Sequence, residues 1–219
     1  MTWEYGVWHH PGVGISPKDF ATMQERTATG RRRPAPSPVP MGAELSVPSK
    51  KSGHARLLGI DPSLRGTGYG VIELGKPYPK TLAQGTLKCP AGWDQSRCLA
   101  KISQGIRDVI QQFKPEVCAV EGLFFAQNLQ TALIMGQARG AALCMVAEAG
   151  LEIFEISPRK VKQSIVGYGA AQKLAVAKMV QRMLHLEEVP DADAADALAI
   201  ALAYAQTQTG FSLTPPKRV

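Results

Sequence analysis

The sequence lacks the patterns that mark several common kinds of catalytic site. It contains no GxxxxGK[ST] phosphate loop, no HExxH zinc motif and no GxSxG nucleophile motif. Its four cysteines form no CxxC pair and have no histidines at zinc-ligand spacing; they are Cys89, Cys98, Cys118 and Cys144. We therefore expect neither a zinc site nor a disulfide framework, and a reducing compartment such as the cytoplasm fits best.

Long apolar runs are also missing. No stretch reaches the roughly 18 apolar residues that a membrane span needs. The first residues, MTWEYGVWHHPGVG, lack the basic start and apolar run of a secretion signal, so we expect no export and no membrane association. Of the 219 residues, 45% are hydrophobic and 20% charged, which is the balance of a globular protein large enough for one α/β domain.

Acidic residues are too few to balance the basic ones. The chain has 25 Lys and Arg against 18 Asp and Glu, which gives a formal net charge of +7. An excess of that sign favours a polyanionic partner, of which nucleic acid is the commonest. Seven of the basic and four of the acidic residues precede residue 56, so the excess is spread along the chain.

Residues 1–54 show little apolar periodicity. Their segments RRRPAPSPVP and SVPSKKSG combine proline, serine and basic residues, which predicts a disordered basic, Pro-rich extension. This extension could be a DNA-tethering arm, a linker, or the product of an overlong start whose true beginning lies near Met41. We expect one folded domain over residues 55–208 and a flexible basic tail over residues 209–219.

The pattern of the domain predicts three strands followed by alternating helices and strands. Apolar runs bounded by turn residues predict the strands, and apolar residues three or four apart predict the helices. The expected strands cover 57–60, 69–74, 80–88, 117–120 and 152–156, and the expected helices cover 95–113, 129–149, 158–165, 171–184 and 192–206. This order describes an α/β fold with a mixed five-stranded sheet and helices on both faces.

Two carboxylates stand directly after apolar strands, Asp61 after LLGI and Glu121 after VCAV. If the two strands are parallel, both side chains emerge at the same edge of the sheet, where α/β folds place their sites. Asp193 and Asp196 are three residues apart on a predicted helix and share a face that continues through the apolar Ile200. Together the four acids could form a cage for Mg²⁺, which prefers oxygen ligands.

Each acid also has a structural interpretation. Asp191 or Asp193 can cap a helix or favour its dipole, and Asp61 can be a turn residue. Glu121 can pair with an arginine such as Arg139. On the residues alone, these alternatives stay open beside the metal cage.

Five ordered blocks between about Leu57 and Gln206 resemble the RuvC family of Holliday junction resolvases. They are GIDPSLRGTGYGV at 59–71, AVEGLFFAQN at 119–128, GQARG at 136–140, VKQSIVGYGAAQK at 161–173 and DADAADALAIALA at 191–203. The resemblance implies an RNase H-like fold and a cytoplasmic homodimer that makes symmetric nicks in four-way DNA junctions. It also implies phosphodiester hydrolysis with two Mg²⁺ ions, for which Mn²⁺ can substitute.

By motif position, the resemblance assigns catalytic and metal-binding roles to Asp61, Glu121, Asp193 and Asp196. Phe124 resembles the aromatic residue that stacks on bases at the open centre of the junction, with the neighbouring Phe125 as the alternative exposed ring. Lys162 and Lys173 match basic positions implicated in DNA contact. The helix over 129–149 is apolar or small on most sides, and we expect it to pack against the sheet and a second subunit. A branch-migration helicase complex is the other partner that we expect.

The sequence departs from the family pattern in its long N-terminal extension and at Ser63, where a glycine usually follows the Asp-Pro pair. Two rival functions also remain. The segment GIDPSLRGTG resembles the phosphate-binding hairpin of actin-like and sugar-kinase ATPases, although the 163 residues from Leu57 onward are few for the two domains of such enzymes. The other rival binds junctions without cutting them, or cuts RNA–DNA hybrids or flaps.

Overall fold

The computed structural model describes residues 55–122, 129–208 and 216–219. Two features expected from the sequence, the disordered extension over residues 1–54 and the stacking role of Phe124, lie outside the described residues. No helix in the described part of the chain is long and apolar enough to cross a membrane.

A mixed six-stranded sheet forms the centre of the domain, with the strand order β3-β2-β1-β4-β5-β6. Strand β1 is antiparallel to β2 and parallel to β4, while β5 is parallel to β4. Both β1 and β4 are buried on their two faces, which is why they appear in the sequence as continuous apolar runs. The strands are Arg56–Asp61 (β1), Gly66–Glu73 (β2), Lys80–Lys88 (β3), Val117–Glu121 (β4), Glu152–Ile156 (β5) and Lys217–Arg218 (β6).

The sixth strand corrects the expectation of a five-stranded sheet. Lys217 and Arg218 pair antiparallel with β5, and Arg218 forms a 2.8 Å ion pair with Glu152. These two residues therefore lie in the sheet, where the sequence predicted a flexible tail over 209–219. The strand consists of two exposed residues held by backbone pairing, so it leaves no apolar alternation in the sequence.

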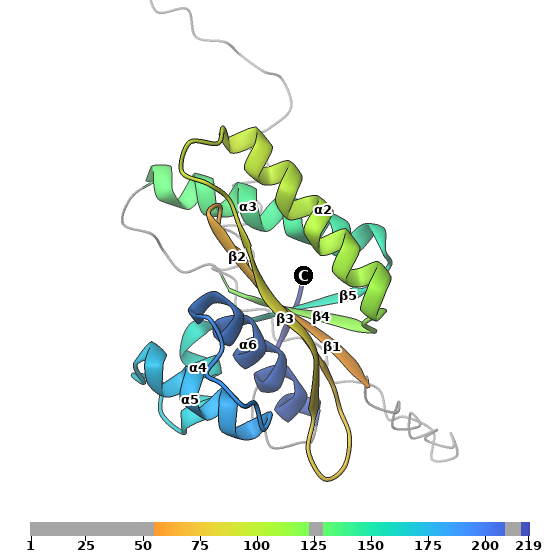
Figure 1. Ribbon diagram of the computed structural model, residues 1–219, viewed down its shortest axis with the longest axis vertical. Helices are drawn as coiled ribbons and strands as arrows, with labels where there is room; N and C mark the ends of the chain where they lie inside the picture. The colour runs from red at the N-terminus through yellow and green to blue at the C-terminus, as the bar shows by residue number, and fades with distance from the viewer. Residues whose placement is uncertain (1–54, 123–128, 209–215) are drawn as a thin grey trace, which may run out of the picture. The chain divides into compact units, whose positions relative to one another are not determined.

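Helices cover both faces of the sheet, as expected (Figure 1). Alternate strand residues separate the two cores: Leu57 packs in the core with α4, α5 and α6, whereas Leu58 packs in the core with α2 and α3. The helices are Gln95–Phe113 (α2), Leu129–Glu148 (α3), Pro158–Val166 (α4), Lys173–Met183 (α5) and Ala192–Gln208 (α6).

Helix α6 packs unusually close to the sheet because small residues face each other. A Cβ atom built on Gly59 would lie 2.0 Å from the carbonyl oxygen of Ala197, and one built on Gly68 would lie 2.0 Å from that of Asp193. Only glycine allows this approach of helix to strand. The contact fixes the first turns of α6 over the ends of β1 and β2, and so determines where its acidic residues lie.

Candidate active site

The two acids that end apolar strands lie side by side. Ile60 of β1 aligns with Val120 of the parallel strand β4, so Asp61 and Glu121 follow at the same edge of the sheet. Both residues are half-buried, and their side chains are hydrogen-bonded to each other. The expectation that parallel pairing would bring these two carboxylates together is confirmed.

The first turns of α6 bring two more acids to this edge. Asp61 aligns with Gly68 across the β1–β2 pair, and the backbone of Asp193 lies directly over Gly68. The carboxylate of Asp193 lies beside Gly66, because a Cβ there would be 2.7 Å from its Oδ2 atom. Asp196 is one turn further along α6, and its charge acts on both Asp61 and Glu121.

The pKa values of the strand-end acids show the cost of gathering these charges. Burial, together with the charges of Glu121 and Asp196, raises the pKa of Asp61 to about 7, while Lys173 opposes the rise. The pKa of Glu121 is also raised, mainly by burial. A divalent cation would supply the positive charge that this cluster needs, so the oxygen-rich set of side chains fits such an ion.

The carboxylates share one edge of the sheet but are not grouped as closely as metal ligands are. Within residues 55–122, 129–208 and 216–219, no three His, Cys, Asp or Glu side chains are grouped closely enough to hold a metal ion as they stand. A metal ion bound here would therefore draw the acids closer than they lie in this structure.

Two lysines predicted from the sequence lie beside the acids. Lys173 Nζ is 2.8 Å from Asp196 Oδ2, and this hydrogen bond is the main reason that the pKa of Lys173 is raised. Lys162 joins Lys173, Glu121 and Asp196 in the lining of a pocket of about 180 Å³. The remaining lining residues are apolar apart from their backbones: Pro158, Val161, Val176 and Ile200.

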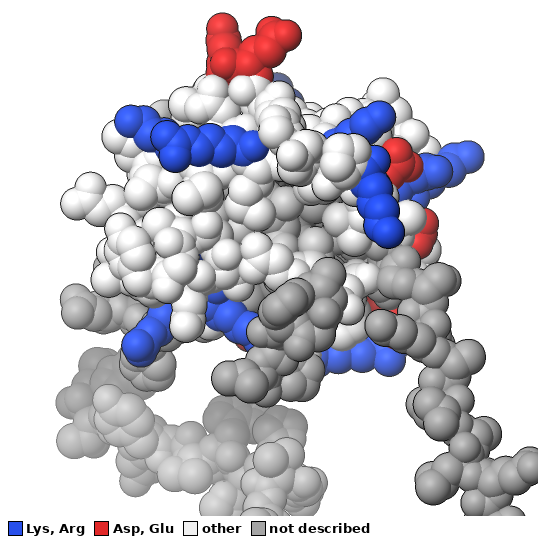
Figure 2. Space-filling model, turned by 90° about the horizontal axis from the view of Figure 1, so that it is seen from below, with Lys and Arg blue, Asp and Glu red and all other residues white. Residues whose placement is uncertain are grey.

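On one face of the molecule the basic side chains are dispersed. Figure 2 shows Lys and Arg side chains spread over a largely uncharged face of the molecule rather than gathered in one patch. The pocket with Lys162 and Lys173 places two basic groups directly beside the carboxylate cluster.

One structural alternative for the acids is wrong. Arg139 does not pair with the carboxylate of Glu121; it donates a hydrogen bond to the backbone carbonyl of Glu121 and forms a 2.6 Å ion pair with Glu155. Asp191 forms a 3.3 Å ion pair with Lys88. Asp193 does lie in the first turn of α6, so its favourable interaction with the helix dipole stands beside any role in the site.

Sequence reasoning placed Arg139 near Glu121 but missed its bond to the backbone of Glu121, and it overlooked Glu155. Arg139 lies in a helix of small and apolar residues, and Glu155 interrupts the apolar strand EIFEI. A charged residue in a segment that is otherwise buried needs a partner. That conflict is the signal that could have found both residues, although it could not have shown that they are each other's partner.

Comparison with known proteins gives a consistent result. Residues 57–204 match the family described as crossover junction endodeoxyribonuclease RuvC. The protein of that name from Akkermansia muciniphila is 48% identical over 149 residues, which cover 68% of this chain and 89% of the relative. The one from Chromohalobacter salexigens is 46% identical over 163 residues, covering 74% and 86%.

Solved structures agree on the fold. Thermus thermophilus RuvC in complex with Holliday junction substrate matches with a TM-score of 0.69 and 34% identity, covering 76% of this chain and 100% of that one. The yeast mitochondrial Holliday junction resolvase Ydc2 matches at 0.50 with 16% identity, covering 71% and 81%, and shows the shared fold alone. The expected RNase H-like α/β fold is thus confirmed, and the chain belongs to the RuvC family of crossover junction endodeoxyribonucleases.

Proposed function

We propose that this protein resolves four-way DNA junctions by metal-dependent phosphodiester hydrolysis. The observation that carries the proposal is the meeting of the strand-end acids Asp61 and Glu121 with Asp196, beside Lys162 and Lys173. The solved structure of the Thermus thermophilus relative with Holliday junction substrate supports the same choice of DNA.

The four acids of the site would hold Mg²⁺, or Mn²⁺ in its place, and two ions fit the number of carboxylates. When bound, such ions activate a water molecule and stabilise the charge on the leaving oxygen. The acids in this role are Asp61, Glu121, Asp193 and Asp196. The raised pKa of Asp61 supports the assignment, because uncompensated negative charge is what a divalent cation relieves.

The lysines and the apolar wall of the pocket serve the substrate. Lys162 and Lys173 attract the DNA backbone, and Lys173 is held at the pocket by its bond to Asp196. The side chains of Val161, Val176 and Ile200 limit the water around the phosphate, which strengthens these charge interactions. Phe124 would stack on bases at the junction centre.

The exposed side of α3 supports a homodimer. Leu129, Leu133 and Met135 are 75%, 58% and 37% exposed, whereas the buried residues of this helix all lie from Ala138 onward. A second copy would cover the apolar first half of α3 and give the enzyme the two-fold symmetry of its substrate. We also propose a branch-migration helicase complex as a partner and the cytoplasm as the place of action, which the four free cysteines support.

The deciding experiment compares cleavage of a synthetic four-way junction, a linear duplex and an RNA–DNA hybrid, each with Mg²⁺ and with EDTA. We expect paired, symmetric nicks that are confined to the junction and need the metal. Cutting of the hybrid or of flaps instead would show that the substrate is not the four-way junction. Binding without cutting would contradict the proposed catalysis.

Asp61→Asn should abolish cleavage and retain junction binding; loss of both would indicate a structural role for Asp61. ATP binding in calorimetry would favour the ATPase rival.

A further inference from the structure

Arg139 stands out among the buried residues of the described chain. Among the described residues, only two polar or charged residues are buried, Thr67 and Arg139, and Arg139 is 7% exposed. It projects from α3 between small neighbours, Ala138 and Ala142, which are fully buried. A buried guanidinium is costly unless its donors are used, so its partners identify what it does.

The partners of Arg139 lie on two different strands. Its Nη1 donates to the backbone carbonyl of Glu121 at the end of β4. Its Nη2 is 2.6 Å from Oε2 of Glu155 on β5, in an ion pair whose side chains are 8% and 29% exposed. The rigid planar fork of arginine directs two separate nitrogens at these two acceptors, a geometry that the single nitrogen of lysine does not have.

The bonds of Arg139 close the end of the β4–β5 pair. The next residue after Glu121 is Gly122, whose backbone N–H donates to the carbonyl of Ile156 at 2.8 Å. The side chain of Glu155 packs against Gly122, because a Cβ there would lie 3.2 Å from the Cγ atom of Glu155. Arg139 thus holds the main chain on which Glu121 sits, and not the carboxylate of Glu121.

We propose that Arg139 is a positioning residue of the nuclease site, which fixes the direction of Glu121 through its backbone while its ion pair with Glu155 holds the guanidinium in place. The inference rests on the proposed function. It adds a residue from α3 to a site whose acids come from β1, β4 and α6. Because the first half of α3 carries the exposed apolar face, the same helix links subunit pairing to the position of Glu121.

The alternative is that Arg139 only balances the charge of Glu155. The two explanations separate in a set of three variants: Arg139→Gln, Glu155→Gln, and both together. Arg139→Gln alone leaves a half-buried carboxylate without its partner, and this variant can fail to fold for that reason. The double variant removes both charges, so it should regain the melting temperature of the wild type while the bond to the Glu121 carbonyl is still weakened.

The decisive measurements are made on the full-length double variant. We expect its kcat on the four-way junction to fall on the order of 10²-fold, because small displacements of a catalytic group have effects of that size. The Kd for the junction in EDTA should stay within about two-fold, and the affinity for Mn²⁺ alone, by calorimetry, should weaken roughly 10- to 100-fold. Wild-type kcat and Mn²⁺ affinity in the double variant would overturn the proposal.

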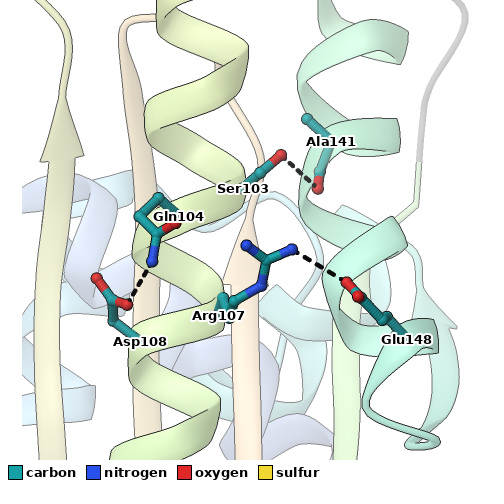
Figure 3. Close-up of polar contacts among 6 residues, drawn as sticks. All are labelled: Ser103, Gln104, Arg107, Asp108, Ala141 and Glu148. Carbon is teal, nitrogen blue, oxygen red and sulfur yellow. Dashed lines mark hydrogen bonds and ion pairs between the residues drawn. The ribbon is translucent and has the colours of Figure 1, made fainter.

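A matched control comes from another ion pair that involves α3 and an arginine. Arg107 of α2 lies 3.2 Å from Glu148, the last residue of α3 (Figure 3), and the two side chains are 41% and 62% exposed. Arg107→Gln should change neither kcat nor Mn²⁺ affinity; an equal loss in this variant would show a general effect of α3 and overturn the specific role. If the wild type fails to cut junctions, the proposed function is wrong, and the Mn²⁺ titration still decides the role of Arg139.

Discussion

Helices α6 and α3 have similar compositions and opposite surroundings. Both are rich in alanine and apolar residues, and neither has a clear polar face in its sequence. Ten successive residues of α6 from Asp196 onward include only one that is not buried, Asp196 itself, whereas none of the first nine residues of α3 is buried. The described part of the chain therefore covers the apolar surface of α6 and leaves much of that of α3 exposed.

The difference follows from what each helix meets. Gly59 and Gly68 bring α6 into backbone contact with the sheet, and this close packing leads its acidic end to the strand-end carboxylates. Helix α3 packs against α2 and β5 with buried residues from Ala138 onward, and Ser103 of α2 donates a hydrogen bond to the carbonyl of Ala141 (Figure 3). Burial of α6 brings its acids to the candidate site, while the exposed start of α3 is the surface on which the proposed dimer depends.

The largest effect is expected where α6 reaches the site. Asp196→Asn removes one carboxylate charge next to Asp61 and Glu121 and weakens the ion pair with Lys173. A metal site contributes several kcal/mol of transition-state stabilisation, so kcat should fall on the order of 10³-fold or more. Single-turnover cleavage of the junction measures this. An Asp191→Asn control, which affects only the exposed pair with Lys88, should cut like the wild type.

If Asp196→Asn retained normal kcat, Asp196 would have no part in catalysis and the comparison with α3 would lose its functional meaning. Thermal melting of the variant separates loss of chemistry from loss of folding.

The second prediction tests close packing against open space. Gly59→Ala places a methyl group 2.0 Å from the carbonyl oxygen of Ala197, so α6 must move, at a cost of about 3 kcal/mol or more. Gly140 on α3 has nothing within 4 Å of an added Cβ, and Gly140→Ala should stabilise the protein by roughly 0.5 to 1 kcal/mol. Urea unfolding of both variants measures the difference. Equal effects would contradict the contrast between the helices.

The same two helices show how far the sequence could be interpreted. The strand-end acids were predictable because each ends a continuous apolar run, and the helix over 95–113 was predictable because burial on one side leaves a periodic pattern. Helix α3 was predictable as a helix, but its uniform composition could not indicate which half is covered. The bridge from Arg139 to Glu155 joins residues 16 positions apart on two elements, and only the fold shows that they meet.

The third prediction concerns the exposed half of α3. Leu133→Glu places a charge on a face that we expect a second copy to cover, so dimer dissociation should become easier by about 2 kcal/mol or more, roughly 30-fold in Kd. Sedimentation of the wild type and the variant over a range of concentrations measures this. Leu174→Glu is the control, because Leu174 is similarly exposed but lies on α5. A wild type that stays monomeric at high concentration would refute the dimer.

The smallest effect is expected for the exposed ion pair of α3. Arg107→Ala should lower the free energy of unfolding by about 0.5 kcal/mol or less, because solvent screens the charge of Glu148 and both side chains are mobile. Arg139→Met breaks a buried pair on the same helix and should cost about 3 to 5 kcal/mol. Urea unfolding of the two variants tests whether burial decides the value of an ion pair on α3. Similar losses would mean that burial does not decide the value of an ion pair on α3.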